Sequence, residues 1–261
     1  MTTVRLGRYI YGLGGIAYGI TTLVWHQIDS LGNFSHPEFL VYLAGIFELV
    51  GGVAIQWQRT ARFGALTLSA VFSIFALHWI SQIVKTPVVF GPWGNFGEQF
   101  SIVAGGVIVF ASTIRSIPKR ATTIEIAAYG CFGLCVISYA LYQLFYLTYT
   151  AGLVPTWIPP GQMFWAIATT VAFALAGIAL LSGLSALLAS QLLTIMLILF
   201  GLLVWLPPAF TDPQKMSNWT EFAATLAMAA SSWIVADFLS QPNIFPRRWP
   251  FVHFPAKQEE S

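Results

Sequence analysis

The stretch LSALLASQLLTIMLILFGLLVWL, residues 184–206, contains no charged side chain and decides the class of fold. A helix needs about 20 apolar residues to cross a hydrocarbon core of about 30 Å, and this stretch is long enough. The rest of the chain agrees, because 57% of its residues are hydrophobic, 8% are charged and the mean hydropathy is +0.73. So little charge cannot cover a soluble surface. The sequence therefore predicts an all-α integral membrane protein.

Similar apolar runs recur along the chain, and together they predict eight transmembrane helices. The runs are residues 9–28, 38–57, 63–84, 97–114, 124–149, 162–181, 184–206 and 219–239. The first run has a short charged region before it and no evident small-residue cleavage site. We therefore expect a retained helix and not a cleaved signal peptide.

The Lys and Arg residues predict the orientation, because cytoplasmic loops of membrane proteins hold most of the positive charge. With the N-terminus inside, the outer loops hold only Lys85 and Lys215. The inner segments hold Arg5, Arg8, Arg59, Arg62, Arg115, Lys119, Arg120, Arg247, Arg248 and Lys257. We expect an inner-membrane protein with both termini in the cytoplasm.

Two short polar segments resemble each other and indicate an internal repeat. GNFGEQF at residues 94–100 is echoed by SNWTEFA at 217–223, so that Asn95 and Glu98 recur 123 positions later. Because four helices lie in each half, the halves enter the membrane in the same direction, as parallel repeats do. The predicted organisation is a first four-helix repeat (1–114), a cytoplasmic linker (115–123), a diverged second repeat (124–239) and a cytoplasmic tail rich in Pro and aromatic residues (240–261).

The echoed Asn and Glu residues have the spacing of a capping box, in which both side chains satisfy free N–H groups at a helix start. Two further pairs have this spacing: Ser35 with Glu38, and Thr122 with Glu125. We expect these acids, including Glu98 and Glu221, to begin helices.

Glu48, in AGIFELVGG, follows no capping rule and lies near the middle of the second run. An acid at that depth is costly and usually faces the bundle interior in a functional role. Gly45 and Gly52 share its helix face and leave room for a neighbouring helix. Glu48 is either a proton-transferring residue or a structural, protonated acid hydrogen-bonded to another helix.

A second polar layer is expected near the outer surface, where His26, His78 and Glu98 reach similar depth. Such a cluster could exchange protons with a quinone. Interfacial histidines bound to water and loop carbonyls are the alternative. The predicted catalytic residues are Glu48, His26 and His78, and the predicted quinone-binding residues are Glu48, His78, Trp79 and Glu98. No spacing typical of a metal or nucleotide site occurs, so neither is predicted.

Four tyrosines at 3, 4, 3 spacing place their phenols on one helix face beside Gln143: Tyr139, Tyr142, Tyr146 and Tyr149. This stripe could line a polar or quinone-accepting groove between the halves. Aromatic packing at a helix interface is the alternative use.

GIFELVGGVAIQWQRTARFGAL, residues 45–66, is similar to the pattern of the DoxX/DoxD-like membrane protein family. In that pattern a Gly-x-x-Glu-x-x-Gly-Gly helix is followed by a short Arg-containing inner loop and a helix of small residues. By position, Glu48, Gly51, Gly52 and Arg62 match it. The resemblance covers the first repeat and is fainter over the second, where the matching Glu and Arg are lost.

The resemblance implies a four-helix module, here in tandem, from a group that includes the membrane subunit of thiosulfate:quinone oxidoreductase. Family members also include partners of thiol-handling enzymes and chaperone-like or assembly proteins. Two functions therefore stand. The chain is either the membrane subunit of a quinone-linked oxidoreductase, with a separate subunit supplying electrons, or a cofactor-free assembly subunit of a larger membrane complex. Lipids and a partner subunit are expected to bind it, and no nucleic acid.

Overall fold

The computed structural model describes residues 5–31, 37–114, 118–241, 248–249 and 252–253. Its long helices are α1 (Arg5–Trp25), α2 (Glu38–Ala54), α3 (Ala61–Lys85), α4 (Gly91–Thr113), α5 (Pro118–Phe145), α7 (Gln162–Ser182), α8 (Ala186–Phe200) and α10 (Met216–Leu239). Shorter elements are η1 (Asp29–Leu31), α6 (Leu147–Leu153), the π-helical turn η2 (Gly201–Trp205), α9 (Leu206–Thr211) and the paired strands β1 (Arg248–Trp249) and β2 (Val252–His253).

Each of the eight apolar runs contains one long helix, so the all-helical prediction is confirmed for the membrane-embedded part. Six helical segments are long and apolar enough to cross a membrane: α3, α4, most of α5, α7, the continuous segment Ala186–Thr211 and α10. The first two helices fall outside this set. Helix α2 has 17 residues, and α1 contains Arg8 within its first turns.

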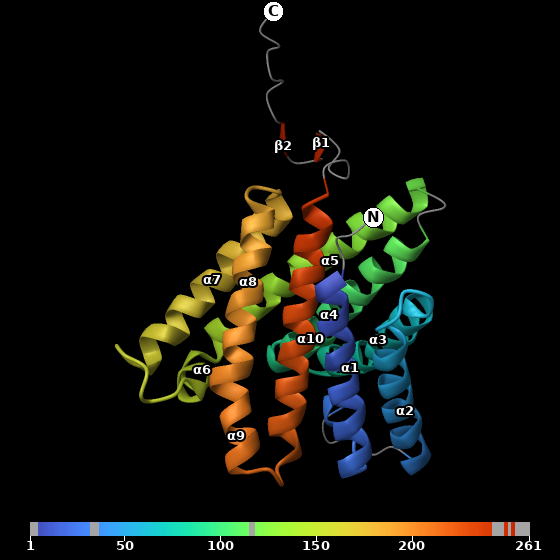
Figure 1. Ribbon diagram of the computed structural model, residues 1–261. Coiled ribbons are helices and arrows are strands. Elements are labelled where there is room, and N and C mark those ends of the chain that lie inside the picture. The colour runs from blue at the N-terminus through green and yellow to red at the C-terminus, as the bar shows by residue number, and fades with distance from the viewer. Residues whose placement is uncertain (1–4, 32–36, 115–117, 242–247, 250–251, 254–261) are drawn as a thin grey trace, which may run out of the picture.

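The long helices form a closed ring in which each contacts the next along the chain, and α10 returns to α1. Helices α4 and α10 also contact each other across the centre. Figure 1 shows α1 and α10 side by side, with the start of α1 and the end of α10 at the same end of the molecule. Two contacts fix this antiparallel pair: Gly7 lies against Ile234, and the Trp25 indole donates to the Gln214 carbonyl at 3.1 Å.

Small residues allow the central helices to approach closely. A Cβ added at Gly105 of α4 would lie 2.3 Å from the Ser231 hydroxyl of α10, so a larger residue cannot fit there. Among the described residues, no large apolar side chain of α10 is exposed.

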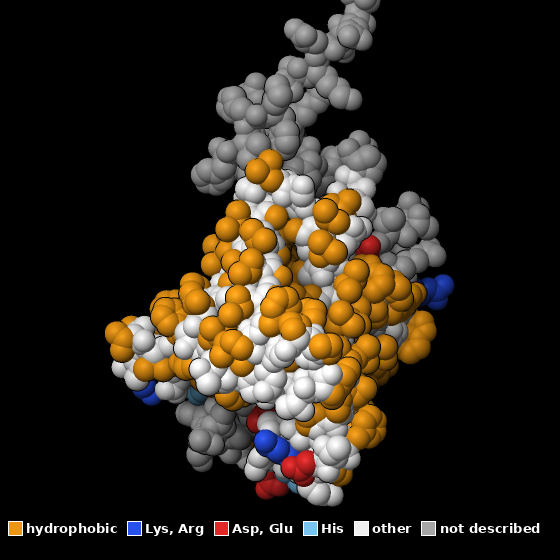
Figure 2. Space-filling model, turned by 90° about the vertical axis from the view of Figure 1, so that its left-hand side faces the viewer, with side chains coloured by type: hydrophobic (Ala, Val, Ile, Leu, Met, Phe, Trp, Pro, Cys, Tyr) orange, Lys and Arg blue, Asp and Glu red, His pale blue; other side chains and the backbone are white. Residues whose placement is uncertain are grey.

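The peripheral helices, unlike α10, expose large apolar side chains. One face of α7 exposes Phe164, Ile167, Val171, Leu175 and Ile178. Figure 2 shows such apolar surface over much of the side that α7 and α8 form, with charged side chains near the margins. Repeated exposure of apolar residues at helical spacing fits contact with lipid tails. The protein is therefore a multi-pass membrane protein.

The predicted capping boxes are wrong. Helix α4 begins at Gly91, with Pro92 in its first turn, so Asn95 and Glu98 lie inside it. Helix α10 begins at Met216, and Asn218 is its third residue. The Asn218 amide instead donates to the carbonyls of Pro208 and Asp212, at 3.1 and 3.2 Å, and holds α9 against α10.

The Thr122–Glu125 pair is not at a helix start, and the Ser35–Glu38 pair stays a prediction. Thr122 and Glu125 lie inside α5. Pro37 precedes α2, and Ser35 falls outside the described residues. Residues 115–117 of the predicted linker and most of the predicted tail also fall outside them, whereas residues 118–123 of the linker belong to α5.

Candidate functional site: a cavity beside the central helices

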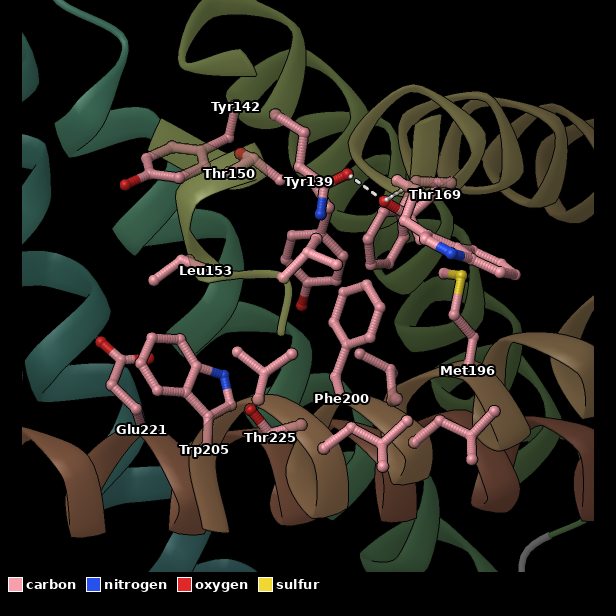
Figure 3. Close-up of a pocket in the computed structure, with 18 of the residues that line it drawn as sticks. Tyr139, Tyr142, Thr150, Leu153, Thr169, Met196, Phe200, Trp205, Glu221 and Thr225 are labelled. Carbon is pink, nitrogen blue, oxygen red and sulfur yellow. Dashed lines mark hydrogen bonds between the residues drawn. The ribbon is translucent and has the colours of Figure 1, made fainter. Parts of the chain in front are cut away.

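A cavity of about 350 Å³ lies where α4 and α10 face α5, α6, α7 and α8 (Figure 3). Most of its wall is apolar, with Phe173, Met196 and Phe200 among the lining residues. Its polar lining residues are Asn95, Glu98, Tyr139, Tyr142, Gln143, Tyr149, Thr150, Thr169, Glu221 and Thr225. Small-molecule sites typically have this size and this combination of apolar walls with a few polar groups.

A break in the fifth apolar run builds one wall. Helix α5 ends at Phe145, and Tyr146 leaves the helical conformation with φ −115° and ψ 38°. The chain then forms α6, which brings Tyr149 and Thr150 back over the cavity. The loop after α6 is held by Gln162, whose amide donates to the Val154 carbonyl at 2.6 Å.

A π-helical turn builds the opposite wall. Residues Gly201–Trp205 form this turn between α8 and α9, just before Pro207 and Pro208. The two prolines cannot donate the usual helical hydrogen bonds. Such turns widen a helix locally and are frequent at functional sites. This one places Leu203, Val204 and Trp205 along the cavity.

Carboxyl groups gather at one side of the cavity. Glu98 of α4 and Glu221 of α10 interact electrostatically with each other and with Asp29 of η1. The Gln99 amide donates to Glu98 at 3.3 Å. In Figure 3 the Glu221 carboxyl and the Tyr142 hydroxyl lie toward the same side. The echoed acids therefore face one shared site.

Hydroxyl and amide groups hold the rest of the polar lining in place. The Gln143 side-chain oxygen accepts hydrogen bonds from Thr169 at 3.0 Å and Thr170 at 3.1 Å (Figure 3). Its amide nitrogen is thereby oriented as the donor. The buried Tyr139 hydroxyl donates to the Ser101 hydroxyl. A ligand carbonyl oxygen in the cavity could therefore accept from the Gln143 amide, whereas the Tyr139 proton is already used by Ser101.

The structure separates the predicted site residues. Only Glu98 lines the cavity. His26 is exposed just after α1 and packs on Tyr42, with ring centroids 5.5 Å apart. His78 packs on Trp79 at 5.6 Å, and the Trp79 indole donates to a loop carbonyl at 2.9 Å.

Glu48 lies in a different place, fully buried between α1 and α2. The Thr22 hydroxyl donates to one of its oxygens at 2.9 Å, and the other oxygen has no hydrogen-bond partner among the described residues. The expected small-residue face is confirmed, since a Cβ at Gly52 would meet the Gly12 carbonyl at 2.6 Å and one at Gly45 would meet Leu23 at 2.7 Å.

Sequence reasoning assigned Glu221 only to a helix start and did not find Trp205 or Phe200. The echo did carry a signal, because it singled out Glu221 together with Glu98. The tyrosine stripe carried another: Tyr139, Tyr142 and Tyr149 line the cavity with Gln143, whereas the Tyr146 hydroxyl accepts from the Gly91 N–H at 3.1 Å.

Comparison of the chain with protein families, with curated proteins and with solved structures finds no match. In the part of the chain that the structure describes, no three His, Cys, Asp or Glu side chains are grouped as metal ligands. The cavity itself therefore carries the functional argument.

Proposed function

We propose that this chain is the membrane subunit of a quinone-linked oxidoreductase and that the cavity beside α4 and α10 binds the quinone head group. The single observation that carries the proposal is the lining of this cavity. Aromatic and apolar side chains such as Phe200 and Trp205 suit a flat ring, and Gln143 and Tyr142 offer donors to its carbonyl oxygens.

The carboxyl groups fit the chemistry of a quinone. Reduction to the quinol takes two electrons and two protons. In this proposal a redox-active partner subunit supplies the electrons. Glu98 and Glu221 supply the protons to the two oxygens, since a carboxyl within reach of the reacting atom is an effective proton donor.

The proposed architecture has eight transmembrane helices, arranged as two parallel four-helix repeats. Helices α1 and α2 expose apolar residues as the peripheral spans α3 and α7 do, including Leu13, Ile20, Ile46 and Val50. The contacts of α1 to α4 are repeated among α5, α7, α8 and α10, and α4 contacts α5 as α10 contacts α1. This supports a two-fold relation about an axis along the membrane normal, with both termini in the cytoplasm of an inner-membrane protein.

The DoxX/DoxD-like resemblance of the first half agrees with this assignment and remains part of the proposal. Its matching residues, Glu48, Gly51 and Gly52, make up the tight contact of α2 with α1 and α3. They therefore support the shared four-helix module and not the quinone site itself.

The proposal is tested by purifying the protein in mild detergent, extracting bound quinone for mass spectrometry, and titrating decylubiquinone while recording tryptophan fluorescence. Trp165 and Trp205 line the cavity, so saturable quenching is expected. Gln143→Leu removes the oriented donor and should weaken binding about tenfold, equivalent to about 1.4 kcal/mol.

Gln82→Leu is the matched control, because Gln82 lies on α3 outside the cavity lining. Its quinone affinity should equal that of the wild type. Absence of extracted quinone together with unsaturable quenching would replace this proposal by the assembly-subunit function.

A further inference from the structure

A line of polar groups extends from the cavity in two directions, toward η1 and toward Glu48. On the η1 side, Asp29 lies outside the candidate spans and interacts with Glu221 and Glu98. On the other side, Tyr18 of α1 lies one helical turn before Thr22, whose hydroxyl donates to Glu48 at 2.9 Å, and the Tyr18 hydroxyl is within electrostatic range of Glu98. Four elements, η1, α2, α4 and α10, thus place one acid each along this line.

Buried oxygens without partners mark the middle of this path. The Tyr18 side chain is 2% exposed and that of Gln99 is 3% exposed. Tyr18 OH lies close to the Gln99 side chain but outside ordinary hydrogen-bond geometry. Neither this hydroxyl nor Gln99 Oε1 nor Glu48 Oε1 has a hydrogen-bond partner within the described ranges. Buried polar atoms are nearly always hydrogen-bonded to protein or water, so these oxygens are suited to hold internal water molecules.

We infer that Asp29, Glu221, Glu98, Gln99 and Tyr18 line a proton-transfer route that begins at η1, serves the cavity and ends at Glu48. Protons move along it between carboxyl oxygens, the tyrosine hydroxyl and bound water, and no bond other than O–H forms or breaks. Its use in quinone reduction rests on the function proposed above, whereas the route itself can be measured without any quinone.

The entrance has the properties that such a route needs. Asp29 is half-buried, and burial raises the pKa of its carboxyl, while a hydrogen bond with Thr220 acts in the opposite direction. Segment η1 contacts α3 and α10, and the Trp79 indole fixes it through the Ser30 carbonyl. An acid held at this boundary can exchange protons with solvent and with Glu221.

Infrared spectroscopy of the purified protein tests the route. At a pH where Glu48 is a carboxylic acid, its C=O band is assigned by its loss in Glu48→Gln, and transfer into D₂O then shifts the band as the proton exchanges. We expect Tyr18→Phe to slow exchange at Glu48 at least tenfold while leaving exchange at Glu98 and Glu221 unchanged. Asp29→Asn should slow exchange at all three acids.

Tyr11→Phe is the matched control, because Tyr11 is an equally buried tyrosine of α1 whose hydroxyl donates to the Ile102 carbonyl at 2.8 Å. It should leave all exchange rates unchanged. Gln99→Met provides a second interruption of the route if Tyr18→Phe does not fold. Unchanged exchange at Glu48 in both variants would overturn the route. Loss of quinone binding with intact, variant-sensitive exchange would overturn only the proposed function.

Discussion

The two halves of the molecule pack differently around their buried acids. In the first half, α1 and α2 approach until their backbones touch: a Cβ at Gly52 would lie 2.6 Å from the Gly12 carbonyl and 2.7 Å from the Ile16 nitrogen. In the second half, Gly177 of α7 still packs closely on Ile137 of α5, but a Cβ at Gly130 would have no atom within 4 Å, and the cavity opens where Glu221 lies beside Glu98 of α4. The difference teaches that a buried carboxyl becomes a ligand site only where the surrounding helices leave space.

The largest expected effect comes from filling the tight contact. Gly52→Ala places a methyl group against two backbone positions that cannot rotate away, so it should lower the free energy of unfolding by about 1–3 kcal/mol. Gly130→Ala is the matched control in open space and should raise it by about 0.5–1 kcal/mol, because alanine favours the helix. Thermal unfolding in detergent measures both changes, and equal effects would remove the packing contrast.

The cavity allows a second test of the same contrast. Thr225 is 3% exposed and lines the cavity from α10, so Thr225→Leu adds volume where the proposed ring binds. We expect at least tenfold weaker decylubiquinone binding with an almost unchanged unfolding temperature. Thr21→Leu on α1 controls for adding the same volume elsewhere, since the Thr21 hydroxyl only bonds its own helix at 2.8 Å. Equal affinity of the Thr225 variant and wild type would show that the ligand binds elsewhere.

The helices were largely predictable, because lipid contact and core burial both require apolar runs whose length is fixed by the membrane. The ends of the helices were less predictable. The break at Tyr146 and the early start of α4 at Gly91 depend on contacts between helices. The π-helical turn before Pro207 and Pro208 was not predicted, because the length of the apolar run was the only feature used there.

The candidate site was predicted only in part, because Glu98 is the one predicted site residue that lines the cavity. The 123-residue echo and the tyrosine spacing selected Glu98, Glu221 and Tyr142, but a local capping rule gave the acids the wrong role. A cavity formed by seven helical segments is a property of their mutual packing, which no short motif encodes. Glu48 was selected because of its expected depth in the membrane. The close glycine contacts around it leave no space comparable to the cavity beside α4 and α10.

The echoed asparagines offer a smaller test, because they have diverged in their contacts. Asn218→Ala removes two hydrogen bonds that join α9 to α10 and should lower the free energy of unfolding by about 1–2 kcal/mol. Asn95→Ala changes a cavity-lining residue inside α4 and should stay within about 0.5 kcal/mol of wild type. Equal losses in the two variants would restore the capping interpretation.

Glu48 is expected to give the smallest change when it is replaced by glutamine. The Gln side chain keeps an oxygen that can accept from Thr22, so Glu48→Gln should stay within about 0.5 kcal/mol of wild-type stability. Glu48→Ala should cost about 1–3 kcal/mol, because it leaves the buried Thr22 hydroxyl without its acceptor. Unfolding in detergent measures the stability of the Glu48→Gln and Glu48→Ala variants. Quinone titration of Glu48→Gln then shows whether the ligand binds beside α4 and α10 or near Glu48. Unchanged quinone affinity keeps the ligand beside α4 and α10, whereas a tenfold loss would move it to the first half, since Glu48 is not part of the cavity wall.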